Sequence, residues 1–209
     1  MSVLTNEQKV KILSEIVAIP SVNDNELAVA QYLAQWLNQY DIDTHIDYIS
    51  GQRANLIATI GSGKPVVAVS GHMDVVNEGN HDDWTSPPFE LTERNGHLYG
   101  RGAADMKSGL AALVIAMIEI KASGQLKNGT IKLLATAGEE MEQAGSEQLY
   151  RKGYMDDVDA LVIAEPSYPS IVYAHKGSMD IKITSKGRSS HSSTPFMGEN
   201  AITPLIELI

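Results

Sequence analysis

The sequence predicts an α/β fold: a mainly parallel, mixed sheet with helices on both of its faces. Three short, almost purely apolar runs at Val66–Val69, Ile131–Ala135 and Leu161–Ala164 are typical of strands covered on both faces. A strongly apolar helix is predicted between the first two runs, from Ser108 to about Ala122, and Ser123-Gly124 ends it. This alternation of strands and helices indicates a mainly parallel sheet.

Two helices and a strand are predicted ahead of these runs. The first helix begins at a capping box formed by Thr5 and Gln8 and ends before Pro20; the second begins at about Glu26. The strand covers residues 55–60, and a further helix covers residues 145–152. Apolar residues recur at helical spacing and are expected to face the core: Val10, Leu13, Ile16 and Val17, then Val29, Leu33, Trp36, Leu37 and Tyr40.

The pattern changes from Ser178. Residues 179–184 alternate between apolar and polar, which predicts a half-exposed strand, and a helix pattern opens near Glu199-Asn200 and still runs at Ile209. We therefore expect one domain in residues 1–177, the beginning of a second in residues 178–209, and a longer protein of which this is the N-terminal portion.

Composition excludes several classes of protein. Of 209 residues, 43% are hydrophobic and 20% charged, values typical of a globular protein with a core. No apolar run approaches the roughly 18 residues of a membrane helix, and the first residues do not resemble a signal peptide, so we expect a cytoplasmic protein without a membrane partner. The net charge of -10 argues against nucleic acid. With 0 cysteines, any metal must be held by His, Asp or Glu.

Chemically active residues follow each buried strand and also precede the apolar helix. The carboxyl ends of parallel strands meet at one edge of a sheet, where ligands bind in α/β folds. An imidazole with several carboxylates is a ligand set for zinc, cobalt or manganese. The residues are His72 and Asp74, Asp105, Glu139 and Glu140, and Glu165.

Each group has a structural alternative when taken alone. A His-x-Asp sequence is usually a turn or a surface hydrogen bond, Glu-Glu at a helix start usually interacts with the helix dipole, and Glu before Pro is usually a loop charge. Four such groups at one strand edge favour a metal site instead, because so many acids would repel one another without a cation.

Motifs along nearly the whole chain resemble the dizinc deacylase and peptidase family, which includes acetylornithine deacetylase, succinyl-diaminopimelate desuccinylase, aminoacylase and the glutamate carboxypeptidases. The matching segments are Ser70–Val76, Trp84 with Pro88-Phe89, Leu98–Gly109, Glu139-Glu140, Ala164–Pro166, and Gly187–His191 with Gly198–Ala201. The resemblance implies a zinc-exopeptidase-like catalytic domain in residues 1–177 and, from residue 178, the start of a smaller α+β lid that forms a homodimer.

The resemblance also implies a site for two zinc ions, with cobalt or manganese as substitutes. His72 and Glu165 correspond to ligands of one ion, Glu140 to a ligand of the other, and Asp105 to the bridge between them. The Asp105–Met106 peptide bond is expected to be cis. The family has a further His ligand near the C-terminus of the full protein, and this chain contains no counterpart.

Three residues correspond to groups that act on the reaction. Asp74 matches the partner that orients the metal-ligating His, and Glu139 matches the general base, which takes a proton from a metal-bridging water and passes it to the leaving amine. His191 matches a lid histidine that polarises the scissile carbonyl in a partner subunit's site. Its alternative is a loop histidine bonded to Ser192 or Ser193.

The implied function is metal-dependent hydrolysis of an N-acyl amino acid or diamino acid. A succinyl group is favoured, because the sequence looks closest to bacterial desuccinylase-like members, which implies diaminopimelate and lysine biosynthesis. The alternatives are N-acetylornithine deacetylase, aminoacylase and dipeptidase. From other classes, the chain could be a non-catalytic binding relative or an inactive fragment. Glu139 beside the metal residues argues against a binding protein, which needs no base.

Overall fold

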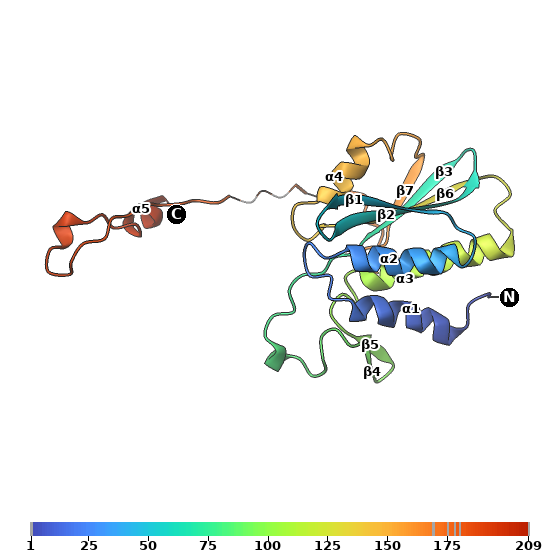
Figure 1. The fold of residues 1–209 in the computed structure, drawn as a ribbon, viewed down its shortest axis with the longest axis horizontal. Coiled ribbons are helices and arrows are strands. Elements are labelled where there is room, and N and C mark those ends of the chain that lie inside the picture. The colour runs from blue at the N-terminus through green and yellow to red at the C-terminus, as the bar shows by residue number, and fades with distance from the viewer. Residues whose placement is uncertain (1, 169, 175, 178, 180, 209) are drawn as a thin grey trace. The chain divides into compact units, whose positions relative to one another are not determined.

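A five-stranded mixed sheet forms the centre of residues 1–168 in the computed structural model of the chain (Figure 1). Its order is β1 (Thr44–Ser50), β2 (Arg53–Ser62), β6 (Gly129–Thr136), β3 (Val66–His72) and β7 (Ala160–Ile163). β3 is parallel to β6 and β7, and β2 is antiparallel to β1 and β6. The predicted α/β class with a mixed sheet is confirmed.

The structure describes residues 2–168, 170–174, 176–177, 179 and 181–208. The chain divides into two units, residues 1–168 and 169–209, each described here by itself. Among the described residues, no helix combines the length and the apolar character needed to cross a bilayer.

Helices cover both faces of the sheet, as predicted. α1 (Asn6–Ala18), α2 (Leu27–Asn38) and α3 (Lys107–Ser123) lie on one face, and α4 (Ala144–Arg151) lies on the other (Figure 1). Successive residues along β2, and likewise along β6, pack into two different hydrophobic clusters, because strand side chains alternate between the faces of the sheet. The larger cluster, with α1–α3, includes Leu56, Ala58, Leu133 and Ala135; the smaller one contains Ile57, Ala68, Leu134 and Leu149 of α4.

Strand β7 departs from the prediction of a strand buried on both faces. Leu161, Val162 and Ile163 are 43%, 53% and 55% exposed. β7 lies at the edge of the sheet, where the described residues supply only β3 as a neighbour. An apolar run therefore predicted the strand correctly but not its burial.

The helix predicted near the N-terminus is present as α1, but its predicted buried face is partly wrong. The capping box of Thr5 and Gln8 is present. Val10, however, is 46% exposed, whereas Ile12 is completely buried. The buried stripe is therefore shifted around the helix from the predicted one.

Within residues 2–168, four short elements were not predicted. Besides β1, they are the 3-10 turn η1 (His81–Asp83) and the hairpin of β4 (Thr92–Arg94) and β5 (His97–Tyr99). Asn95 and Gly96 join the hairpin with positive φ angles of 52° and 74°. Asn-Gly is the preferred sequence for such a two-residue turn.

Residues 169–209 contain the 3-10 turn η2 (Pro195–Met197) and α5 (Thr203–Leu208). The strand predicted over 179–184 is absent from the described residues 179 and 181–184, and residues 178 and 180 lie outside the described part. The helix predicted near Glu199-Asn200 begins slightly later, because Asn200 Oδ1 accepts hydrogen bonds from the main-chain N–H groups of Ile202 and Thr203.

Candidate metal centre

The parallel strands deliver the predicted site residues to one edge of the sheet. In the strand register, His72 of β3 pairs with Thr136 of β6, and Ser70 pairs with Ile163 of β7. The segments that follow these strand ends therefore leave the sheet together. They carry Asp74, Glu139, Glu140 and Glu165; of the other predicted residues of this edge, His72 is the last residue of β3 and Asp105 precedes α3.

His72 lies at the centre of the arrangement and is 2% exposed. Its Nε2 atom is 3.2 Å from Asp105 Oδ1, 3.8 Å from Glu139 Oε2 and 3.7 Å from Glu165 Oε1. Its Nδ1 atom lies 2.9 Å from the main-chain carbonyl oxygen of Asp74 and 3.6 Å from the Asp74 carboxylate. A proton on Nδ1 donated to this carbonyl leaves the lone pair of Nε2 directed at the acids.

Two overlapping groups of side chains have the composition and the spacing of metal ligands. One group is His72, Asp105 and Glu140, the other His72, Glu139 and Glu165, and within each group the ligand atoms lie within 4.8 Å of one another. One imidazole with carboxylates suits zinc, cobalt or manganese. The donor set of this edge therefore fits a divalent metal.

Burial and neighbouring carboxylates shift the pKa values at the site. Burial lowers the pKa of His72, but nearby carboxylates, those of Asp74 and Glu165 foremost, outweigh burial and raise it. Burial raises the pKa of Glu165 to about 7; His72 opposes this rise and neighbouring carboxylates add to it. The pKa of Glu140 is also raised, with burial as the largest cause. Because the pKa of each of these three groups is raised, positive charge is favoured at this edge, and a bound cation would supply it.

Asp105 is placed by the loop between Gly100 and α3. The Asp105–Met106 peptide bond is cis, which confirms the expectation from the resemblance. The Met106 side chain is completely buried, and its sulfur accepts a hydrogen bond of 3.0 Å from the main-chain N–H of His72. A Cβ on Gly71 would lie 2.5 Å from Met106 Cε, so glycine is needed there for Met106 to pack against β3. The loop is thereby fixed to the strand that carries His72.

Asp74 holds the loop that carries the two adjacent glutamates. Its carboxylate oxygens accept hydrogen bonds from the main-chain N–H groups of Glu139 (3.1 Å) and Glu140 (3.0 Å). Asp74 is completely buried. It therefore connects His72 to the loop after β6 as well as facing the imidazole.

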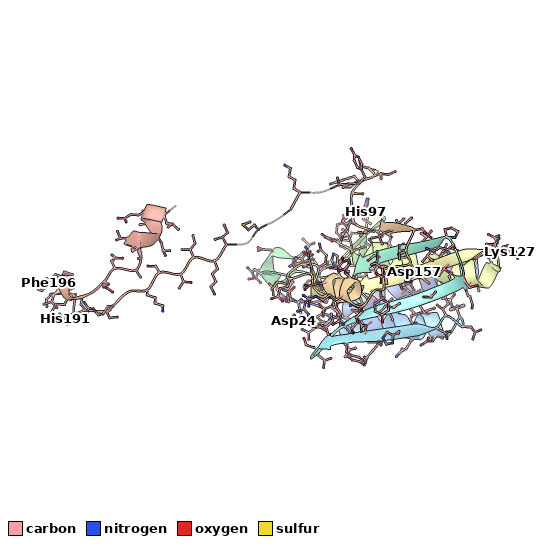
Figure 2. The ribbon with its side chains drawn as sticks, turned by 90° about the horizontal axis from the view of Figure 1, so that it is seen from above. Asp24, His97, Lys127, Asp157, His191 and Phe196 are labelled. Carbon is pink, nitrogen blue, oxygen red and sulfur yellow. The ribbon has the colours of Figure 1, made fainter. Side chains whose placement is uncertain are left out.

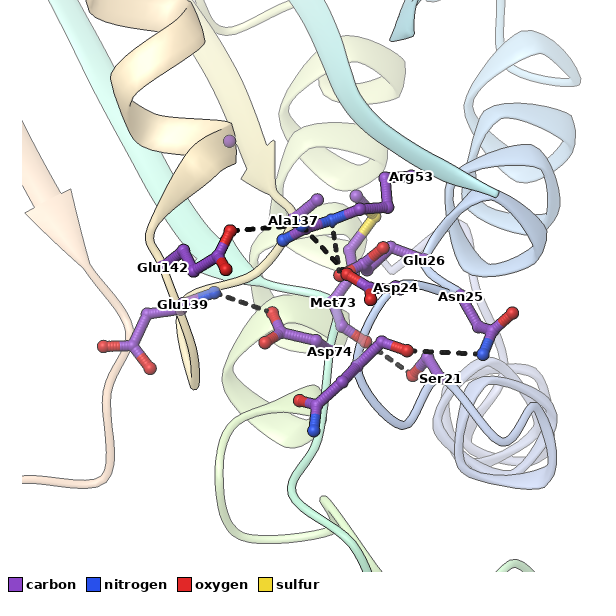
Figure 3. Close-up of polar contacts among 12 residues, drawn as sticks. Ser21, Asp24, Asn25, Glu26, Arg53, Met73, Asp74, Ala137, Glu139 and Glu142 are labelled. Carbon is purple, nitrogen blue, oxygen red and sulfur yellow. Dashed lines mark hydrogen bonds and ion pairs between the residues drawn. The ribbon is translucent and has the colours of Figure 1, made fainter. Parts of the chain in front are cut away.

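Sequence reasoning missed several buried polar residues that support this edge. The Asn55 side chain accepts a hydrogen bond from Ala137 N–H and donates one to the carbonyl of Gly145, at 3.1 Å each. Ser21 Oγ donates to the carbonyl of Met73 at 2.6 Å (Figure 3). Lys107 Nζ donates to two carbonyls at the end of α1. No periodicity marks these contacts, because they join segments far apart in sequence.

His191 belongs to residues 169–209 and is exposed, near η2 and Phe196 (Figure 2). Its Nδ1 atom lies 2.8 Å from Ser193 Oγ. This is the hydrogen bond of its structural alternative. The predicted action of His191 on a substrate carbonyl stays a prediction.

Known proteins resemble the chain along its whole length. The sequence pattern of peptidase family M20/M25/M40 matches residues 68–206. A Staphylococcus epidermidis protein named "Probable succinyl-diaminopimelate desuccinylase" is 54% identical over 209 residues, which are 100% of this chain and 52% of that protein. The chain thus spans about half the length of the curated relatives it matches.

Solved structures share the fold. Human carnosine dipeptidase 1 matches with a TM-score of 0.64 and 29% identity, over 75% of this chain and 38% of that one. A Bacillus subtilis protein described as a dinuclear metal binding peptidase matches with a TM-score of 0.58 and 18% identity, over 75% of this chain and 42% of that one. At 18% identity, the likeness concerns the fold alone.

Proposed function

The chain belongs to peptidase family M20/M25/M40, and from this premise we propose that it carries the metal-binding half of an amide hydrolase that removes an N-acyl group from a small amino acid or diamino acid. One observation carries the proposal. The buried imidazole of His72 faces three carboxylates, those of Asp105, Glu139 and Glu165, within 3.8 Å at the carboxyl edge of the sheet.

Four residues are proposed to hold two zinc ions. His72 and Glu165 would hold one ion and Glu140 the other, with Asp105 shared between them. In support, the ligand atom of His72 lies within 4.8 Å of that of Glu165 in one group and of those of Asp105 and Glu140 in the other. Such ions, when bound, supply Lewis-acid polarisation of a carbonyl and lower the pKa of water. Cobalt or manganese suits the same ligands.

Glu139 is proposed as the general base. Its main-chain N–H is fixed by Asp74, while its carboxylate is 47% exposed and lies 3.8 Å from His72 Nε2. The carboxylate can therefore take a proton from an attacking water beside the ligands and deliver it to the leaving nitrogen without moving its backbone. A protein that only binds its ligand would not need this base.

The preferred substrate class is an N-succinyl diamino acid, in a cytoplasmic route through diaminopimelate to lysine. The support is the name of the relatives at 54% identity. Dipeptide hydrolysis is the second candidate, favoured by the likeness to carnosine dipeptidase 1 at 29% identity. Both reactions cleave an amide next to an amino-acid carboxylate, so the same metal centre would serve either.

Residues 178–209 are proposed to begin a lid and dimerisation domain. In a homodimer, His191 would polarise the scissile carbonyl, and a histidine beyond residue 209 would complete the second metal site. The motifs at 187–191 and 198–201 support this assignment.

The test is hydrolysis by the full-length gene product, with zinc or cobalt added, of a panel of N-succinyl, N-acetyl and dipeptide substrates. We expect the N-succinyl diamino acid to give the highest kcat/KM. A dipeptide with the highest value would favour the second candidate, and bound metal without turnover on any substrate would contradict the proposal.

A further inference from the structure

Arg53, the first residue of β2, lies directly behind the loop that carries Glu139 and Glu140. The loop residue Gly138 has a φ angle of +72°, and a Cβ added there would collide with Nη2 of Arg53. The guanidinium thus packs against the main chain immediately before Glu139. Arg53 is far from the loop in sequence, and the antiparallel pairing of β2 with β6 brings the two together.

The guanidinium is surrounded by carboxylates from two separate segments (Figure 3). Arg53 Nη1 lies 2.9 Å from Asp24 Oδ1 and 3.9 Å from Glu142 Oε2, and Arg53 Nε lies 4.0 Å from Glu26 Oε1. Asp24 and Glu26 precede α2, whereas Glu142 belongs to the loop. Arg53 therefore connects the start of α2 to the loop of the candidate metal centre.

Glu26 explains why a cation is needed at this point. Its side chain is completely buried, and neither carboxylate oxygen has a hydrogen-bond partner among the described residues. Burial raises the pKa of Glu26, and the nearby Asp74 adds to the rise while Arg53 opposes it. A buried carboxylate without hydrogen bonds is costly unless a cation lies close.

Other contacts hold the loop at its ends and at the Gly138 carbonyl, which accepts a hydrogen bond of 2.6 Å from Gln143 N–H. Arg53 adds a contact on the side of Gly138 where a side chain would stand. Asn55 fixes Ala137 and Gly145 at the two ends of the loop, and Asp74 binds the N–H groups of Glu139 and Glu140 from one side. Gly138 has no side chain of its own, and the guanidinium occupies the space beside it.

We propose that Arg53 is a positioning residue of the metal centre: it supports the main chain at Gly138 and thereby sets where the carboxylates of Glu139 and Glu140 stand. The expected effect of Arg53 on turnover rests on the proposed function, whereas its expected effect on metal binding does not. Residues that hold metal ligands in place typically change metal affinity or activity about 10–100-fold when replaced.

The experiment uses the full-length protein with cobalt, and compares four variants. Arg53→Met removes the guanidinium, and Arg53→Lys keeps the charge without its planar fork. Because Arg53→Met would leave Glu26 uncompensated, the double variant Arg53→Met/Glu26→Gln separates positioning from charge compensation. The control is Arg151→Met, which removes an exposed arginine of α4 that pairs with Glu147.

We expect Arg53→Met to lower kcat about 10–100-fold, with KM little changed, to weaken cobalt binding and to alter the cobalt visible spectrum. Arg53→Lys should recover part of kcat. The double variant should regain thermal stability but neither kcat nor the spectrum, and Arg151→Met should match the parent. Joint recovery of stability, kcat and spectrum in the double variant would overturn the proposal, because Arg53 would then only neutralise Glu26.

The cobalt measurements keep this proposal separate from the proposed function. If the parent protein hydrolyses none of the substrates, the proposed function fails, but cobalt affinity and the visible spectrum of the Arg53 variants still decide whether the residue positions the ligands. An unchanged spectrum and affinity in Arg53→Met would refute positioning even if the parent is an active hydrolase.

Discussion

The residues around His72 form two layers that differ in exposure. The inner layer is completely buried and consists of Asp74, Met106 and Lys107. The outer layer consists of three acids whose side chains are 58%, 47% and 38% exposed: Asp105, Glu139 and Glu165. The inner layer binds main-chain groups, whereas the outer layer directs its oxygens at His72 Nε2.

This difference in exposure corresponds to a difference in role: the inner layer stabilises the fold, and the outer layer serves metal binding and turnover. A buried polar group must be paired, since leaving it unpaired costs about 1–3 kcal/mol, so the inner layer is satisfied by the protein itself. In the outer layer, burial raises the pKa of Glu165 to about 7, and the neighbouring carboxylates of Asp105 and Glu139 add to the rise, so this layer favours a bound cation. Replacing an inner residue should therefore reduce stability, and replacing an outer one should affect metal or turnover first.

The largest expected effect is on turnover, from Glu139→Gln in the outer layer. Loss of a general base lowers kcat about 10²–10⁴-fold. Because Glu139 is not a proposed ligand and is exposed, the metal content and the melting temperature should stay close to those of the parent. Steady-state kinetics and elemental analysis of the same preparation measure both. A variant that loses metal would show that Glu139 and Glu140 have each other's roles.

The next effect is on stability, from Asp74→Ala in the inner layer. The substitution leaves the N–H groups of Glu139 and Glu140 without their acceptors. We expect a loss of about 2–4 kcal/mol in the free energy of unfolding, with weaker metal binding as a consequence. Denaturant unfolding of Asp74→Ala and Asp74→Asn measures it, and the Asn variant should lose less because it keeps one acceptor. An unchanged unfolding free energy in Asp74→Ala would mean that the two layers do not differ in this way.

The site residues differ from their more distant supports in how far the sequence predicts them. Glu139 and Glu165 of the outer layer follow strand ends, which apolar runs identify locally, and the parallel strands bring them to one edge with His72. The family motifs added the proposed division of roles between Glu139 and Glu140, which strand ends alone do not distinguish.

Asp74 of the inner layer was predicted as the partner of His72, but supports outside both layers could not be predicted in the same way. Arg53 and Asn55 reach the loop only through the pairing of β2 with β6, and periodicity does not specify which strands are neighbours. For the same reason the apolar pattern of β7 did not reveal an edge position. The hairpin at Asn95-Gly96, in contrast, carried a usable turn signal in the sequence.

Without metal, the stability of the protein should depend on pH through the outer-layer residue Glu165. In the metal-free protein, burial raises the pKa of Glu165 from 4.5 to about 7, so the folded state keeps a proton that the unfolded state has released. The raised pKa of His72 acts in the same direction. The stability of the chelated protein should therefore fall as pH rises between these values. Metal binding requires deprotonated ligands, so added zinc should raise the melting temperature more at about pH 7.5 than at about pH 5.

Thermal melts across pH, with chelator and with zinc, measure this dependence. Glu165→Gln should flatten the pH dependence of the chelated protein, because the replaced side chain does not titrate. If the stability of the chelated protein instead rises with pH over this range, Glu165 does not hold a proton in the folded state.

The smallest expected effect comes from a residue that belongs to neither layer. Arg151 is exposed on α4 and forms an ion pair with Glu147, which lies one helical turn earlier on the same helix. An exposed pair of this kind contributes about 0.3–0.5 kcal/mol, since water screens the charges and both side chains lose freedom. Arg151→Met should therefore change the free energy of unfolding by no more than about 0.5 kcal/mol, with kcat and metal content unchanged. Denaturant unfolding beside Asp74→Ala measures the contrast. If Arg151→Met loses as much unfolding free energy as Asp74→Ala, burial near His72 does not determine which residues stabilise the protein.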